Sequence, residues 1–184
     1  MGFMEGKFVV LGVSGGIAAY RSCELARLLA KDGARVQAVL TEAAAEMVGP
    51  VTFQALTGRP AEVGRGGRLA RTGMAHIDLG RDADLILVAP ATANFLAKAA
   101  HGIADDVLLS TLLAVTCPVL IAPAMNTRMW EHKATQRNVA TCRDELGYEI
   151  IAPGSGFLAC RDVGAGRMAE PADVAARVAA LLAG

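Results

Sequence analysis

Residues 117–130 read CPVLIAPAMNTRMW, and this stretch carries the clearest indication of an α/β fold. Residues 119–122 form a continuous apolar run, as parallel strands do when both of their faces are buried. Pro123 should end the strand, because proline offers no N–H to a sheet and restricts the residue before it. The sequence therefore predicts a buried strand and, at its carboxyl end, a loop where open α/β sheets bind ligands.

Asn126 is the candidate binding residue in that loop, because its amide can hold a carboxylate or carbonyl oxygen. An N-cap for a helix that begins near Thr127 explains the same residue equally well. The loops after the other predicted strands therefore bear on which interpretation applies.

On both sides of this stretch, strand-like and helix-like segments alternate along the chain. Such alternation is typical of a parallel sheet with helices on both faces. We expect one α/β domain over residues 1–184, with a Rossmann-like (flavodoxin-like) open parallel sheet. The predicted strands, besides 119–122, cover 7–13, 35–40, 84–89 and 148–152, and the predicted helices cover 17–31, 92–100, 105–114, 131–146 and the residues from 171 onward, with a short helix or turn at 52–57.

The composition argues against several other classes of protein. The chain has 184 residues, 53% of them hydrophobic, and its 18 Lys and Arg balance 18 Asp and Glu. This balance argues against nucleic acid or a membrane as partner, and the apolar runs are too short to span a bilayer. The four cysteines lack the spacing of a metal site or disulfide scaffold, and the start lacks a signal-peptide layout. We expect a cytoplasmic protein without a metal.

The sequence GVSGG, residues 12–16, follows the first predicted strand and precedes a helix. The backbone of such a turn can hold a phosphate, to which Ser14 and Thr41, at the end of the next strand, could add hydroxyl groups. A tight turn capped by a serine is the alternative. Glu42 could bind a ribose, but the turn is not GxGxxG, so a dinucleotide such as NAD is only weakly indicated.

The loop PATAN, residues 90–94, repeats the design of the loop that contains Asn126. It follows the predicted strand 84–89 directly, and its small side chains would let a flat aromatic ligand lie against the backbone. The alternative makes Thr92 and Asn94 caps of the next helix. Because the carboxyl ends of parallel strands share one edge of a sheet, two such loops favour a common ligand.

Two further residues are candidates for proton transfer. His76 has the ordinary pKa best suited to a general base, although a lone histidine is more often structural. Cys160 lies beside Arg161 in the glycine-rich segment 154–166. A reactive thiol on a lid is one interpretation of that segment, and a passive surface loop is the other. The basic segment 64–73 is interpreted as a solvated loop.

These segments together resemble the homo-oligomeric flavin-containing cysteine decarboxylases over nearly the whole chain. The resemblance implies an FMN-dependent carboxy-lyase that converts 4'-phosphopantothenoylcysteine to 4'-phosphopantetheine in coenzyme A biosynthesis, through thioaldehyde and ene-thiolate intermediates. It also implies a homo-oligomer, a trimer or dodecamer, with the flavin at a subunit contact. The matching segments are GVSGGIAAYRSCELARLL, TFQALTG, HIDLGRDADLILVAPATAN, GIADDVLLSTLLA, ACRDVGAGRM and, as the most specific, PAMNTRMW.

The resemblance also implies roles for individual residues. His76 would be the base, Asn126 would bind the substrate carboxylate, and Cys160 would donate the proton that completes turnover. The further substrate contacts would be Met129, Ala159 and Arg167, and the FMN contacts would be Gly12, Ser14, Gly15 and Thr41 at the phosphate, Pro90, Thr92 and Asn94 at the ring system, and Phe53 and Met125 elsewhere.

Other functions remain open at this point. A peptidyl-cysteine decarboxylase, acting on the C-terminal cysteine of a precursor peptide, would not need Cys160, and a flavin prenyltransferase would not need PAMNTRMW. A non-catalytic flavin-binding regulatory subunit would not need His76, Asn126 and Cys160 together. An NAD-dependent oxidoreductase is the default for this fold class, and the colour of the purified protein separates it from every flavoprotein.

Overall fold

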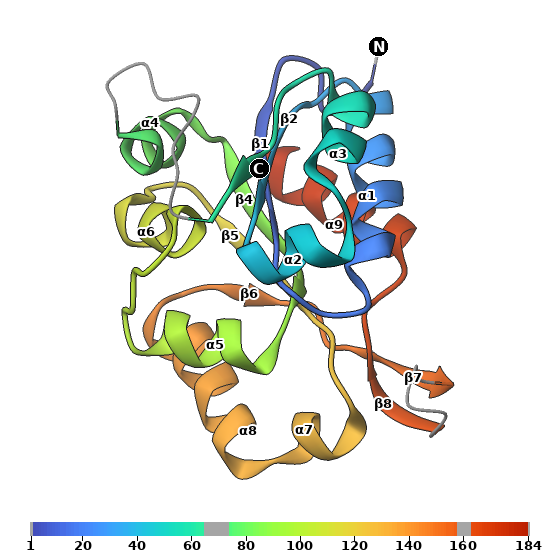
Figure 1. Cartoon of the computed structure of the whole chain (residues 1–184), viewed down its shortest axis with the longest axis vertical. Helices are drawn as coiled ribbons and strands as arrows, with labels where there is room; N and C mark the ends of the chain where they lie inside the picture. The colour runs from blue at the N-terminus through green and yellow to red at the C-terminus, as the bar shows by residue number, and fades with distance from the viewer. Residues whose placement is uncertain (1, 65–73, 158–162, 184) are drawn as a thin grey trace.

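The computed structural model describes residues 2–64, 74–157 and 163–183, which contain a parallel sheet of six strands (Figure 1). Its strands are β1 Phe8–Val13, β2 Arg35–Leu40, β3 Glu62–Val63, β4 Leu85–Ala91, β5 Val119–Pro123 and β6 Glu149–Ile150. Their order in the sheet is β3-β2-β1-β4-β5-β6. The order reverses between β1 and β4, and such a switch point is where sheets of this kind bind ligands. The predicted open parallel sheet is confirmed.

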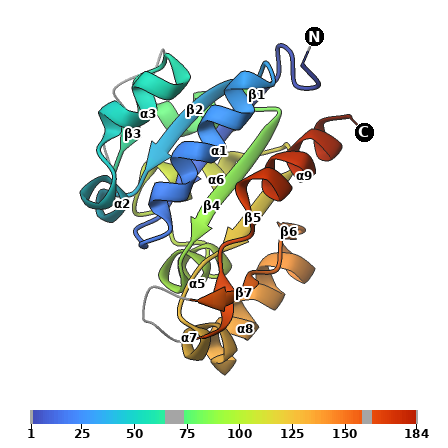
Figure 2. The ribbon, with the colours of Figure 1, turned by 90° about the vertical axis from the view of Figure 1, so that its right-hand side faces the viewer.

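Helices cover both faces of this sheet. In chain order they are α1 Ala19–Lys31, α2 Glu42–Met47, α3 Pro50–Thr57, α4 Ala75–Asp82, α5 Ala93–Ala100, α6 Val107–Ala114, α7 Thr127–Glu131, α8 Lys133–Ala140, the π-helix η1 Thr141–Glu145 and α9 Pro171–Ala183. Figure 1 shows α1, α3 and α9 on one face of the sheet and α4, α5 and α6 on the other. Figure 2 shows α1 and α9 side by side.

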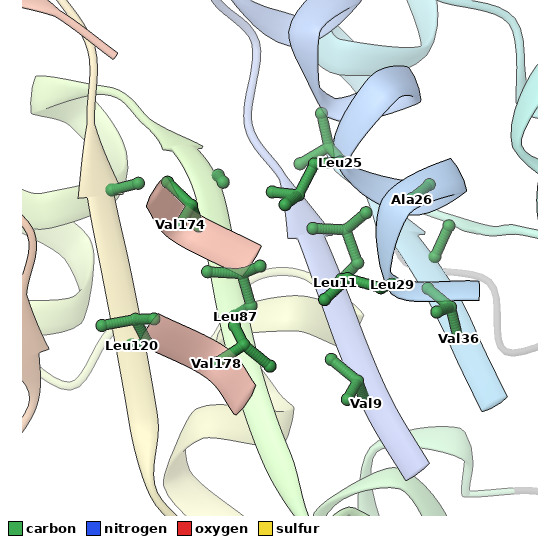
Figure 3. Packing of buried hydrophobic residues seen from close by; sticks show 14 of the residues in the cluster. Val9, Leu11, Leu25, Ala26, Leu29, Val36, Leu87, Leu120, Val174 and Val178 are labelled. Atoms are coloured by element: carbon green, nitrogen blue, oxygen red, sulfur yellow. The ribbon is translucent and has the colours of Figure 1, made fainter. Parts of the chain in front are cut away.

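The strands send alternate side chains to opposite faces, which gives the sheet two apolar cores. In β1, Val9 and Leu11 belong to the core beneath α1 and α9, whereas Val10 belongs to the core beneath α5 and α6. Figure 3 shows the first core, where Val174 and Val178 of α9 pack over the strands. Burying one such side chain contributes about 1.5–3 kcal/mol. The central strands are therefore firmly anchored, and their carboxyl ends have fixed positions.

A separate antiparallel hairpin lies beyond the carboxyl edge of the main sheet. It consists of β7 Gly154–Phe157 and β8 Val163–Arg167, and β8 packs against α7 (Figure 2). The sequence predicts only a glycine-rich loop here, so the two strands are a correction to that expectation. The segment between them, which contains Ala159 and Cys160, lies outside the described residues.

The end of β4 also differs from the prediction. The sequence predicts a stop before Pro90, but β4 continues to Ala91, which pairs with Pro123 of β5 after a shift in register. A proline is tolerated at such an irregularity because its nitrogen has no ladder hydrogen bond to make there. The extra length carries the following loop out to the edge of the sheet.

The remaining differences concern helices. The helix predicted over 131–146 is divided at His132, whose ring Nδ1 accepts the Ala134 N–H at 3.2 Å and so caps α8. The helices α2 and α4 are not predicted, because each is short and depends on packing more than on a sequence pattern. The strand predicted over 148–152 is reduced to β6. Residues 65–73, most of the predicted solvated loop, lie outside the described residues.

Candidate functional site

A cavity of about 710 Å³ lies at the carboxyl edge of the sheet, within the size range of ligand pockets. Its walls come from the loops after β1, β2, β4 and β5 and from the β7–β8 hairpin. The strand ends singled out in the sequence thus meet at one place, which we call the edge pocket. The predicted site residues that line it are Ser14, Gly15, Thr41, Thr92, Asn94, Met125, Asn126, Met129 and Arg167.

Ser14 joins the first loop to the loop after β4. Its side chain is buried, with 2% exposed. The Ser14 Oγ donates to the Pro90 carbonyl at 2.8 Å and accepts the Thr92 N–H at 2.9 Å. This hydroxyl therefore fixes the distance between the tips of β1 and β4, on either side of the switch point, in addition to lining the edge pocket.

Gly15 allows a close approach between the first loop and α2. A Cβ at this position would lie 2.3 Å from the Ala43 Cβ, so no larger residue fits without a shift of α2. Thr41 precedes α2 and its Oγ1 accepts the Ala44 N–H at 3.1 Å. A hydroxyl that accepts in this way still carries a hydrogen that it can donate to a ligand.

The loop after β4 both caps the next helix and lines the edge pocket, the two interpretations that the sequence left open. Thr92 caps α5, because its Oγ1 accepts the Phe95 N–H at 3.2 Å. Thr92 and Asn94 also line the edge pocket, with the small Ala93 between them. Capping and ligand contact are therefore compatible here.

Asn126 shows the same combination after β5. Its Oδ1 accepts the Arg128 N–H at 2.9 Å and caps α7, and the residue lines the edge pocket. Met129, on α7, lines the pocket with about half of its surface exposed (48%). The short helix α7 and its N-cap residue thus present one apolar and one polar side chain to the same cavity.

The hairpin docks onto this loop through glycines. The Met125 N–H donates to the Gly166 carbonyl at 2.9 Å. A Cβ on Gly166 would lie 2.2 Å from the Met125 carbonyl oxygen, and its φ of +130° favours glycine. A Cβ on Gly164 would lie 2.5 Å from the Thr127 Oγ1. Only glycines therefore let β8 approach closely enough to place Phe157 and Arg167 at the edge pocket.

Three residues predicted to contact a cofactor are placed elsewhere. Gly12 is buried within β1, where a Cβ would lie 2.6 Å from the Leu108 side chain, so its small size serves packing. Phe53 is fully buried in the core beneath α3. Pro90 contributes its carbonyl to Ser14 and is not among the residues that line the edge pocket in the described parts of the chain.

His76 is also apart from the edge pocket within one chain. It is half-buried near the start of α4, which packs against α6 on the face of the sheet away from α1. The described lining contains Asn126 and not His76. One copy of the chain therefore does not assemble the predicted pair, and the catalytic role of His76 stays a prediction.

Several lining residues were not predicted. Among them are Arg21 of α1, Lys98 of α5 and Asp106, the N-cap of α6, while Glu42 of α2, considered in the sequence only as a ribose contact, also lines the pocket. Burial raises the pKa of the Asp106 carboxyl, and the charge of Asp105 adds to this, although the Leu109 N–H and Lys98 act in the opposite direction. The position of Arg21 early in the helix after GVSGG was the available signal, because the start of that helix faces the pocket.

The described cysteines are poorly suited to chemistry. Burial raises the pKa of Cys142 to about 11, and it also raises the pKa of Cys23 and of Cys117. Within residues 2–64, 74–157 and 163–183, no three His, Cys, Asp or Glu side chains form a group that could hold a metal ion. None of the helices in these segments combines the length and the apolar character needed to cross a membrane.

Comparison with curated proteins identifies a family and a relative of this chain. A family model described as Flavoprotein matches residues 3–183. The chain is 46% identical over 171 residues to the Coenzyme A biosynthesis bifunctional protein CoaBC of Haemophilus influenzae, and the match covers 93% of this chain and 42% of that protein. The chain thus spans less than half the length of this relative.

Two solved structures are similar over nearly their whole length. The FMN-dependent cysteine decarboxylase SpaF has a TM-score of 0.84 and 36% identity, with 97% of this chain and 98% of that chain covered. A cysteine-to-serine variant of PPC decarboxylase complexed with pantothenoylaminoethenethiol has a TM-score of 0.85 and 30% identity, with 97% and 99% covered. These matches confirm the resemblance found in the sequence, and the chain belongs to the Flavoprotein family.

Proposed function

We propose that this chain binds FMN in the edge pocket and decarboxylates the cysteine end of 4'-phosphopantothenoylcysteine, giving 4'-phosphopantetheine. The observation that carries the proposal is the meeting of four strand-end loops and a hairpin at one cavity that includes Asn126 and Arg167. The names of the relatives point to the same chemistry, because CoaBC is a coenzyme A biosynthesis protein and the two structures are decarboxylases.

The edge pocket fits a flat ring that carries a phosphate. Gly15 and Gly16 line the pocket without side chains, so the backbone of the first loop can contact an anion there. Small residues, Ala93 and Ala124, line the pocket at the ends of β4 and β5, where a ring can lie against the backbone. Ser14, Gly15 and Thr41 would hold the phosphate, and Thr92, Asn94 and Met125 would adjoin the ring system.

The side chains would bind and orient the substrate. FMN, when bound, supplies reversible two-electron chemistry, which the side chains of the chain lack. The Asn126 amide would hold the carboxylate that leaves as carbon dioxide, and Met129 and Arg167 would hold the rest of the substrate. Cys160 would give the final proton to carbon. Ala159, beside Cys160, would complete the substrate contacts; both residues belong to the segment between β7 and β8.

His76 would reach the edge pocket from a second copy of the chain. Exposed apolar side chains occur on the two packed helices α4 and α6: Met74, at the start of α4, is 52% exposed and Leu113 of α6 is 62% exposed. Exposed apolar residues on neighbouring helices are suited to an interface with another subunit. A homo-oligomer, as a trimer or a dodecamer, would thus bring the base of one subunit to the Asn126 of the next.

The Asn126→Asp variant tests the proposal. Aspartate caps a helix as well as asparagine does, so α7 should be retained. Its charge would repel the substrate carboxylate, and we expect kcat/KM to fall by about 100-fold or more. Mass spectrometry of the product, with FMN absorbance as a check on loading, measures this. A parent protein that binds no FMN, or that leaves the substrate intact, contradicts the proposal.

A cysteine-ended peptide is the second substrate to test. The match to the cysteine decarboxylase SpaF covers 98% of the SpaF chain. Parallel reactions with 4'-phosphopantothenoylcysteine and with the peptide separate the two functions. Loss of carbon dioxide from the peptide alone would assign the chain to peptide modification. We expect the phosphorylated substrate to react and the peptide to remain unchanged.

A further inference from the structure

Arg21 is a buried charge beside the edge pocket. It lies on α1, and it is only 8% exposed although arginine is normally a surface residue. A buried guanidinium group is costly unless its charge and its N–H groups are satisfied. Its partners therefore indicate what this residue is placed to hold.

Both partners of Arg21 come from the segment directly after β8. Its Nη1 donates to the Met168 carbonyl at 2.8 Å, and its Nη2 forms an ion pair with the Glu170 carboxylate. These residues lie 147 and 149 positions from Arg21 in the chain. The contact therefore ties α1, which begins beside the first loop, to the base of the β7–β8 hairpin.

Glu170 is shared with a second arginine. The Arg167 Nη2 lies 3.1 Å from the Glu170 Oε1, and Arg167 lines the edge pocket together with Arg21. Two guanidinium groups thus flank one carboxylate, and the three side chains carry a net charge of +1. The shared carboxylate holds Arg167 in place while a positive charge remains at the pocket for an anionic ligand.

The base of the hairpin is anchored on its other side as well. The Met168 side chain is 2% exposed and belongs to the core beneath α1 and α9. The Glu170 carbonyl accepts the Val174 N–H at 3.0 Å at the start of α9. Arg21 thus closes a ring of contacts that joins α1, α9 and the end of β8.

We propose that Arg21 and Glu170 are positioning residues, which hold the β7–β8 hairpin and its Arg167 at the edge pocket for the anionic substrate. This inference depends on the proposed function in one respect only, which is the identity of the substrate. The geometry of the contact between α1 and the hairpin does not depend on that identity.

The Arg21→Met variant of the FMN-loaded protein is the test. Methionine keeps much of the apolar bulk and leaves the exposed Glu170 without a buried partner. We expect KM for 4'-phosphopantothenoylcysteine to rise about tenfold, with kcat within about threefold and the FMN Kd within about twofold of the parent. Hydrogen exchange at the Met125 amide, which bonds to Gly166 of the hairpin, should become about tenfold faster. The Ser14 amide, which bonds to Pro90, should be unaffected.

Two further variants separate positioning from folding. Arg21→Lys keeps the charge near Glu170 but loses the planar group that also reaches the Met168 carbonyl, so its KM and exchange rate should lie between those of the parent and of Arg21→Met. Arg177→Met removes an arginine of α9 whose pair, Glu149, lies on β6 of the main sheet and not on the hairpin, and it should change neither quantity.

Other results would overturn the inference. An FMN Kd raised about tenfold with KM unchanged would make Arg21 a direct cofactor contact. Faster exchange with an unchanged KM would make the contact purely structural, and unchanged exchange would show that Arg21 does not hold the hairpin. If the parent protein decarboxylates neither substrate, the proposed function fails, but hydrogen exchange still decides whether Arg21 holds the hairpin.

Discussion

Single residues at the edge pocket combine a structural and a ligand-facing role. Thr41, Thr92 and Asn126 each cap a helix with a side-chain oxygen, and each also lines the cavity. A cap requires a polar side chain at the first turn of a helix, and in this fold those turns lie at the edge where ligands bind. The two interpretations that sequence patterns leave open for such residues therefore hold together.

Asp106 permits a prediction at the same scale. Its Oδ1 accepts the Leu109 N–H at 2.8 Å and caps α6, while burial raises its pKa. Because the folded state holds this proton more tightly than the unfolded state does, the charged carboxylate costs stability as pH rises above the ordinary pKa. Asp106→Asn keeps the cap and removes the charge. We expect the variant to be at least as stable as the parent at pH 7.

Thermal unfolding of the ligand-free protein across pH checks this expectation. The difference in Tm between Asp106→Asn and the parent should shrink as pH falls below the ordinary carboxyl pKa, because both states of the parent are then protonated. Asp173→Asn, on α9, is a control at a carboxyl outside the edge pocket. A variant that is less stable than the parent at pH 7 would mean that the charge of Asp106 stabilises the fold.

Among the secondary-structure elements, the hairpin depends most on particular glycines. Gly166 has a φ of +130° and approaches the Met125 carbonyl, so Gly166→Ala must displace β8 or the loop after β5. We expect a loss of about 1–3 kcal/mol where the hairpin docks, seen as faster exchange at the Met125 amide and a lower decarboxylation rate. Gly154→Ala on β7 is a matched control, because its Cβ would have only the Arg167 carbonyl nearby, at 3.9 Å. Equal effects of the two substitutions would contradict this account of the docking.

The sequence predicted those helices and strands whose own residues show a strong pattern. The strand Arg35–Leu40 and the end of α1 at Lys31 were predicted with the observed bounds, because apolar periodicity and Gly33 mark them locally. The strands β7 and β8 carry four glycines and few apolar residues, so their pairing depends on contact with α7 and could not be read from the pattern.

The same reasoning applies to the site. Ser14, Thr92 and Asn126 lie in the loops that follow predicted strands, so position alone indicated that they would meet. Phe53 came only from the family resemblance, whereas Gly12 was also part of the GVSGG turn, and both are buried in packing positions. The position of Arg21 early in the helix after GVSGG indicated the pocket, but its partners Met168 and Glu170 lie far along the chain, and no local pattern reports that contact.

For the whole molecule, the separation of His76 from the edge pocket leads to a mixing experiment. His76→Asn and Asn126→Asp should each be inactive as pure proteins. If the base comes from a neighbouring subunit, mixing equal amounts of the two variants and letting their subunits exchange should restore activity. About one site in four then has both unchanged residues, so up to about a quarter of the parent activity is expected. Size-exclusion chromatography with light scattering gives the number of subunits. Failure to regain activity, with exchange of subunits verified by mass spectrometry, would contradict a shared site.

The course of α9 has a practical consequence. The helix starts at Pro171, just beyond the hairpin, and runs along the sheet beside α1 toward the edge opposite the pocket (Figure 2). An affinity handle fused behind residue 183 would consequently project from the far side of the protein. Molecules tethered to a biosensor chip by that handle should present their openings to the flowing solution, so flavin uptake could be recorded without obstruction by the chip surface.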